Sequence, residues 1–271
     1  MRWLDRPRAR LERAKVHNSE FGRTWNDFVH GDESEPYYPI LQIQDDGEGI
    51  LYVDVSDAFP GEQLALHFGE MLYQLRAALD SLVYEVAILD SGSDPPPDAE
   101  KLEFLIRGSE DSFDQSAWKI APLSDQHRQM IRSVQPYDVP GRGKGEALVA
   151  RTFKELNDLA RKDRHRGLRV VNAWISNKNP LVDVPPGASL DWLKVTPDGL
   201  LDDSGELARF KVSGAADPHA EVQANPNCAF DVTVEDAPPP ADDEDTLAAR
   251  ARTMIACVSI VIEGFEKTLG V

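Results

Sequence analysis

Residues 60–89 read PGEQLALHFGEMLYQLRAALDSLVYEVAIL, and this stretch decides the fold. Apolar residues return at steps of three and four from Leu64 to Leu89, which is the period of an α-helix. Pro60 and Gly61 favour a helix start at this point. The apolar face is too broad for a helix that lies on a surface, so the pattern predicts a helix buried among several others.

The same period predicts three further long helices, over about residues 4–28, 146–166 and 245–265. The last of them is apolar on nearly every side near its middle, so we expect it at the centre of a bundle. Two shorter helices are expected near 110–119 and 123–134, the second with Ser124 as its N-cap.

Strand patterns occur in two parts of the chain. Two β-rich runs, 37–44 and 50–55, flank the turn sequence DDGEG and predict a hairpin. The run LEFLI at 102–106 predicts a short strand. Beyond Gly167, strand-like runs separated by Gly, Pro and Asp predict a small, mainly antiparallel sheet over 168–236.

These patterns predict an α+β fold: a long-helix bundle with an N-terminal β-hairpin and a small, mainly antiparallel sheet in the C-terminal half. The simplest organisation is a single domain over 1–271. Its helical core would comprise 1–167 plus 243–269, and 168–236 would be a β-rich insertion. A division into two domains near residue 167 stays open.

The charge of the chain is acidic overall but uneven. The formal net charge of −18 opposes long-range attraction to nucleic acid. Two stretches are nevertheless basic: residues 2–15 hold six Lys or Arg against two acidic residues, and 142–169 hold nine against four. These stretches could together hold an anion if the fold joins them, or they could only solvate helix faces.

Several classes of function lack their sequence signature. There is no phosphate-binding glycine loop, GxGxxG, HExxH or GxSxG, so no cofactor is expected. Neither the scattered histidines nor Cys228 and Cys257 have ligand-like spacing, and no metal site is expected. The tryptophans fall in apolar patterns that predict packing roles. The chain has no secretory apolar core and no run of about twenty apolar residues, so we expect a soluble, cytoplasmic protein without membrane contact.

Two polar clusters stand out from this background. Arg76 and Asp80 lie one helical turn apart in a leucine-rich helix, a spacing that an ordinary surface ion pair also has. The second cluster is LNDLARKDRHRGL at 156–168. Its cations also suit a helix C-terminus, with Gly167 as the terminator.

Four short motifs carry a resemblance to a known family. They are LRAALDSL at 75–82, FLI at 104–106, IRSVQPY at 131–137 and RKDRHR at 161–166. In order and approximate spacing, over about residues 60–170, they resemble a family of uncharacterised bacterial proteins. The family's motifs are Leu-Arg-Ser-Ala-Leu-Asp-His-Leu, a Phe-Pro-Ile strand, a Leu-Gln-Pro-Tyr turn and a helix that ends Asn-Ile-Asp-Lys-His-Arg. The first motif is in turn similar to the arginine–x4–histidine signature of HEPN-type helical domains, several of which are ribonucleases.

The resemblance implies that Arg76 holds a phosphate while a histidine moves the proton of a ribose 2′-OH. Ser81 stands where the family has its histidine, and Arg161 replaces the asparagine. Arg76 and His165 are therefore the candidate catalytic residues. The candidate binding residues are Asp80, Arg161, Asp163, Arg164 and Arg166.

Three functional hypotheses stay open, and the sequence does not decide whether the protein is an enzyme. The first is a binding or interaction module, whose partner is RNA or a protein and which could form a homo-oligomer. The second is a metal-independent ribonuclease that uses Arg76 and His165. The third is a structural role, in which the polar residues form a buried network between core helices.

Overall fold

The computed structural model describes residues 4–31, 36–56, 59–137, 141–176, 179–197, 199–200, 205–235 and 245–270. By its internal contacts the chain divides into two units. The helical unit comprises Met1–Gly22, Ala65–Leu168 and Ala248–Val271, and the sheet unit comprises Arg23–Leu64 and Arg169–Leu247. The first two long helices of the chain contribute residues to both units.

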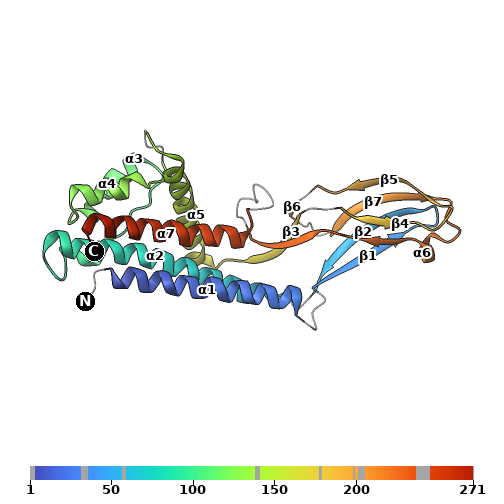
Figure 1. The fold of residues 1–271 in the computed structure, drawn as a ribbon, viewed down its shortest axis with the longest axis horizontal. Helices are drawn as coiled ribbons and strands as arrows, with labels where there is room; N and C mark the ends of the chain where they lie inside the picture. Colours follow the sequence, from blue (N-terminus) through green and yellow to red (C-terminus); the bar gives the residue numbers. More distant parts are fainter. Residues whose placement is uncertain are drawn as a thin grey trace. The chain divides into compact units, whose positions relative to one another are not determined.

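The four predicted long helices are confirmed. They are α1 (Asp5–His30), α2 (Gly61–Ser91), α5 (Lys144–Arg166) and α7 (Leu247–Leu269). In Figure 1, α1, α2 and α7 run side by side within the helical unit. Polar contacts tie α1 to its neighbours, because Arg8 donates to Glu266 of α7 and Arg10 donates to Gln74 of α2 at 3.0 Å.

The broad apolar face of α2 is buried, as its sequence predicts. Leu72, Leu75, Leu79 and Leu82 are completely buried, and each such side chain contributes about 1.5–3 kcal/mol. Phe265 of α7 is buried in the same unit. Among the described residues, no helix is long and apolar enough to cross a membrane.

Short helices connect α2 to α5. They are η1 (Ala99–Lys101), α3 (Glu110–Ser116), η2 (Ala117–Ile120) and α4 (Asp125–Ser133). Ser109 caps α3 by accepting the Ser112 N–H, and Ser124 caps α4 by accepting the His127 N–H. The cap predicted at Ser124 is therefore confirmed.

The sheet unit contains the predicted hairpin, but the hairpin does not stand alone. Strands β1 (Tyr37–Ile43) and β2 (Glu48–Val55) pair antiparallel, and β2 also pairs with β7 (Glu206–Ser213). With β5 (Ser189–Val195) they form one sheet of order β1-β2-β7-β5. The sequence placed the hairpin and the C-terminal strands at separate points, because pairing across more than 150 residues leaves no local signal.

The remaining strands are also antiparallel, as predicted for the C-terminal half. One sheet has the order β6 (Gly199–Leu200), β3 (Val170–Ser176), β9 (Ala229–Val234). The other pairs β4 (Leu181–Asp183) with β8 (Gln223–Asn225), and the short helix α6 spans Pro218–Glu221.

The strand predicted at 102–106 is wrong. These residues are extended but belong to no helix or strand. Phe104 and Leu105 are completely buried, so their backbone polar groups need partners other than water. Side chains from α2 and from Gln135, just beyond α4, supply those partners.

Candidate functional site

The Arg76–Asp80 pair of α2 holds the backbone of the extended segment at Phe104. Asp80 Oδ1 accepts the Phe104 N–H at 2.9 Å, and Arg76 Nη2 donates to the Phe104 carbonyl at 3.3 Å. Arg76 Nη2 also lies 3.4 Å from Asp80 Oδ1. The two side chains therefore satisfy both polar groups of residue 104, as a neighbouring strand would.

Gln135 holds the next part of the same segment. Its side chain is completely buried, its Nε2 donates to the Leu105 carbonyl at 2.7 Å, and its Oε1 accepts the Arg107 N–H at 2.9 Å. Arg142 in turn donates to the Gln135 carbonyl at 2.6 Å. The motifs LRAALDSL, FLI and IRSVQPY thus meet in one polar framework.

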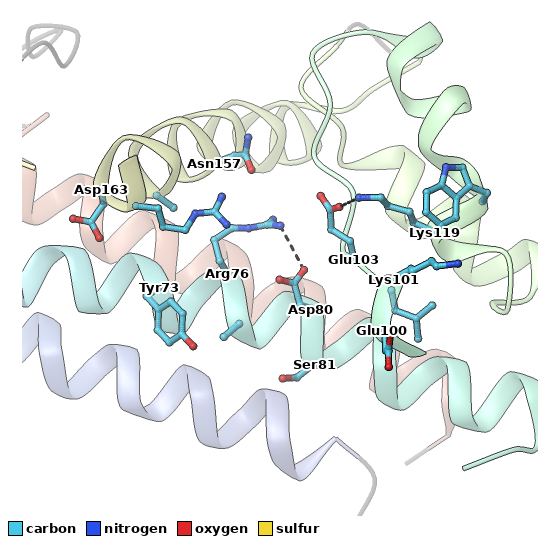
Figure 2. Close-up of a pocket in the computed structure, with 15 residues that line it drawn as sticks. Tyr73, Arg76, Asp80, Ser81, Glu100, Lys101, Glu103, Lys119, Asn157 and Asp163 are labelled. Atoms are coloured by element: carbon cyan, nitrogen blue, oxygen red, sulfur yellow. Dashed lines mark hydrogen bonds and ion pairs between the residues drawn. The ribbon is translucent and has the colours of Figure 1, made fainter. Parts of the chain in front are cut away.

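A cavity of about 830 Å³ lies beside this framework (Figure 2). Its walls come from α2, from residues 100–103, from η2 and from α5. Two aromatic side chains on its lining, Tyr73 and Trp118, are 52% and 51% exposed. The charged lining residues are Arg76, Asp80, Glu100, Lys101, Glu103, Lys119, Asp163 and Arg164.

Glu103 gathers two cations at the wall of this cavity. It accepts from Arg107 Nη1 at 3.0 Å and from Lys119 Nζ. Burial alone would raise the pKa of Glu103, but the hydrogen bonds from Arg107 and Lys119 outweigh it and hold the pKa below its ordinary value. Glu103 is therefore a firmly ionised anchor for Lys119.

The pKa of the Asp80 carboxyl group is shifted in the opposite direction. The surrounding protein withdraws it from water and raises its pKa above the ordinary value, although Arg76 and the Phe104 N–H act in the other direction. The charge of Arg164 also lowers this pKa by a small amount.

Arg76 keeps one donor unused. Its side chain is only 14% exposed, and its Nη1 atom is buried with no hydrogen-bond partner among the described residues. A buried donor without an acceptor costs about 1–3 kcal/mol, more for a charged group. Arg76 lines the cavity, so a rotation of its guanidinium group could bring this donor to an anionic ligand.

Asp163 lines the cavity, but its carboxyl group interacts mainly with the backbone at the end of α5. Burial raises the pKa of its carboxyl group, which accepts the Leu168 N–H just beyond the end of α5. Figure 2 shows its carboxylate directed away from the Arg76–Asp80 pair. Gly167, at φ 71°, ends the helix as the sequence predicts, and its N–H donates to the Asp163 carbonyl at 3.0 Å.

The structure brings together four of the predicted site residues. Arg76, Asp80, Asp163 and Arg164 all line the cavity, and so does Ser81, at the position of the family's histidine. The other three predicted residues do not line it and are exposed on α5; they are Arg161, His165 and Arg166. The sequence also missed Lys101, Lys119 and the half-exposed Trp118, whose ring lies under both ammonium groups at 5.9 and 5.8 Å.

A smaller cavity of about 300 Å³ adjoins the first and shares Asp80, Ser81 and Leu102 with it. Arg6 of α1 lines this second cavity. One arginine from each basic stretch, Arg6 and Arg164, therefore borders this pair of cavities. Arg6 also lies 3.5 Å from a carboxylate oxygen of Glu85, and other cations of these stretches have carboxylate partners, including Arg8, Lys15 and Lys154.

Comparison of the chain with protein-family models, with curated proteins and with solved structures finds no match. The likeness to the bacterial family and to HEPN domains therefore stays an expectation. The chemistry of the cavity is the basis for a functional assignment.

Proposed function

We propose that the protein is a binding module whose cavity takes a nucleoside phosphate, either free or at the end of a single-stranded RNA. The observation that carries this proposal is that Arg76, whose Nη1 donor has no partner among the described residues, lines a cavity that also exposes Trp118. An arginine donor suits a phosphate oxygen, and an exposed indole suits a base.

The residues around Trp118 support this ligand class. Stacking of a base on an aromatic ring is worth about 1–3 kcal/mol. Lys101 and Lys119 flank the ring, and Arg164 faces the cavity from α5. A base on Trp118 would therefore carry its phosphate into a locally cationic part of the cavity.

The charge of the rest of the chain limits the size of the ligand. A net charge of −18 repels a long phosphate backbone, and four carboxylates line the cavity beside its four cations. One or two phosphates can be bound by Arg76 and Arg164, whereas a duplex would meet acidic surface. A protein partner is the other outcome that the binding test can return.

The ribonuclease alternative needs a proton-transfer group. Arg76 lines the cavity, but Ser81 stands at the family's histidine position, and a serine is not a general base near neutral pH. His165 is exposed and does not line the cavity. Catalysis would therefore require movement of α5 or a histidine from another copy of the chain.

Quenching of tryptophan fluorescence tests the binding proposal. AMP and a short single-stranded oligoribonucleotide should both quench the emission, and Trp118→Ala should remove most of the quenching and weaken binding about tenfold or more. Trp192→Ala is the matched control, because Trp192 is 44% exposed but lies in the sheet unit. Arg164→Ala should weaken binding and reduce its dependence on salt.

Binding unchanged in Trp118→Ala, or no binding of either ligand, would refute the nucleoside phosphate proposal. Co-purification of a protein that Trp118→Ala releases would favour the protein-partner hypothesis instead. Cleavage of labelled RNA by the wild type, lost in His165→Ala, would favour the ribonuclease, and equal cleavage or none would exclude a role for His165.

A further inference from the structure

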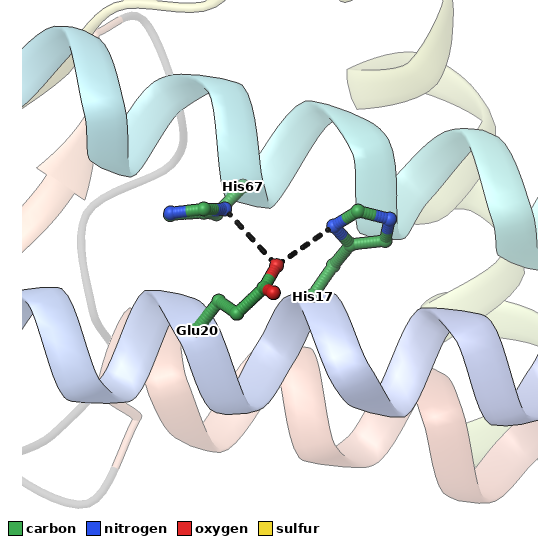
Figure 3. A group of neighbouring side chains, drawn as sticks. All are labelled: His17, Glu20 and His67. Carbon is green, nitrogen blue, oxygen red and sulfur yellow. Dashed lines mark ion pairs between the residues drawn. The ribbon is translucent and has the colours of Figure 1, made fainter.

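Three potential metal ligands, none of which lines the Arg76 cavity, converge between α1 and α2 (Figure 3). His17 and Glu20 stand three residues apart on α1, a spacing that places both side chains on one face of the helix. His67 comes from α2. In Figure 3 both imidazole rings direct one nitrogen toward the same carboxylate oxygen of Glu20.

The distances within this cluster suit coordination better than direct hydrogen bonding. Nδ1 of His17 lies 3.3 Å and Nδ1 of His67 lies 3.5 Å from Oε2 of Glu20, and one ligand atom from each residue lies within 4.8 Å of the others. Metal–ligand bonds of about 2.0–2.2 Å in a tetrahedral site separate neighbouring ligand atoms by about 3.3–3.5 Å. Hydrogen bonds to a carboxylate are shorter, at about 2.7–2.9 Å.

Another buried histidine in the same unit shows the ordinary arrangement. Nδ1 of His127 lies 2.7 Å from Oδ2 of Asp90, so this pair shares a direct hydrogen bond. His17 is equally buried, at 8% exposure, yet its Nδ1 has no hydrogen-bond partner among the described residues. The cluster around Glu20 therefore holds polar atoms at the right separation for an ion between them.

We propose that His17, Glu20 and His67 bind one divalent transition-metal ion of the zinc type, through Nδ1 of each histidine and the carboxylate of Glu20. Imidazole and carboxylate ligands suit Zn²⁺ and its first-row neighbours. Three protein ligands leave a fourth position for water, as in catalytic zinc sites. The site is independent of the proposed nucleoside phosphate binding, because none of its ligands lines that cavity.

The test is a titration of the metal-free full chain with Zn²⁺ in competition with a chromophoric chelator. We expect one Zn²⁺ per chain, and visible absorption bands of a low-symmetry site when Co²⁺ replaces it. Changing a residue that only supports a ligand costs about 10–100-fold in metal affinity. His17→Gln, Glu20→Gln and His67→Gln should therefore each weaken binding by about 100-fold or more. His30→Ala removes an exposed histidine of the same helix and should leave the affinity unchanged.

A second measurement uses the wild type alone, in case a variant does not fold. Zn²⁺ should shift the imidazole resonances of His17 and His67, and not those of the exposed His30 and His219, in ¹H–¹⁵N NMR spectra of the wild type. Absence of stoichiometric Zn²⁺ binding would overturn the proposal. The proposal would also be overturned if folded ligand variants still bind Zn²⁺, or if Zn²⁺ shifts the resonances of neither His17 nor His67.

Discussion

The carboxylate of Asp163 occupies the space that a side chain on Gly69 would need. A Cβ atom added at Gly69 would lie 2.8 Å from Oδ1 and 2.9 Å from Oδ2 of Asp163. Helices α2 and α5 therefore meet at a point where any side chain at position 69 would displace the Asp163 carboxylate. The Asp163 carboxyl group cannot move away freely, because it accepts the Leu168 N–H at the end of α5.

Gly69→Ala should lower the free energy of unfolding by about 1–2 kcal/mol, because overpacking outweighs the better helix propensity of alanine. The measurement is chemical denaturation. Gly22→Ala is the control, since nothing lies within 4 Å of a Cβ at that helical position, and it should stabilise by about 0.5–1 kcal/mol. In an Asp163→Ala background the loss at Gly69→Ala should disappear; a loss that persists would contradict the proposed clash.

Gln135→Ala should destabilise the protein by about 3 kcal/mol, because it strips the buried Leu105 carbonyl and Arg107 N–H of their partner. Thermal or urea unfolding measures the loss. Gln129→Ala, at an exposed position of α4, should change stability by less than about 0.5 kcal/mol. Similar losses in the two variants would show that the extended segment does not depend on Gln135.

Glu103→Gln should cost about 1–2 kcal/mol at neutral pH, since it removes the charge that holds Arg107 and Lys119. The pKa of Glu103 is lower in the folded state than its ordinary 4.5, so its contribution is complete above that value. It is lost as the pH falls through the folded-state pKa. Urea unfolding at several pH values should therefore show that the free energies of unfolding of the wild type and Glu103→Gln become equal in acid. The control is Glu100→Gln, because Glu100 also lines the cavity but is exposed, and this variant should change stability little at any pH.

Asp231→Asn should stabilise the sheet unit at neutral pH. Burial raises the pKa of Asp231 above its ordinary 3.8, although the Val232 N–H bond at 2.7 Å acts against the rise. The folded state then binds the proton more tightly, so wild-type stability falls as the pH rises from 3.8 through the folded-state pKa. Asparagine does not ionise, so the variant does not lose this stability. Its advantage over the wild type is about 1.4 kcal/mol for each unit by which folding raises the pKa of Asp231.

The control for this change is Asp217→Asn, at the exposed N-cap of α6, where asparagine caps equally well. It should show no pH-dependent gain in denaturation experiments. A constant difference between Asp231→Asn and the wild type from acid to neutral pH would contradict the assigned cause.

The features that the sequence predicted correctly depend only on residues that are close together in the chain. The period of three and four from Leu64 to Leu89 is a property of one helix, and the cap at Ser124 involves only its own first turn. The order of the sheet could not be predicted in this way, because Leu51 and Ala208 pair across more than 150 residues. The run at 102–106 has the local pattern of a strand, but Asp80 and Gln135 replace the neighbouring strand that the pattern assumes.

The candidate site residues also differ in whether a local sequence pattern reveals them. Two family motifs led to Arg76, Asp80 and Asp163, which do line one cavity. The exposure of Trp118 depends on how η2 packs, which its own sequence does not specify. His17 and His67 have no ligand-like spacing, since they meet only when two helices fold against each other.

The bonds to residues 104, 105 and 107 also fix the register of the extended segment. Successive side chains of an extended chain point to opposite sides, so a slip of one residue would turn Phe104 away from Phe153, whose ring it meets at 5.8 Å. The same slip would carry Glu103 away from Lys119 and remove that part of the cavity wall. Asp80 and Gln135, which hold the backbone of this segment, therefore also set the positions of the charged side chains that a ligand in the cavity would meet.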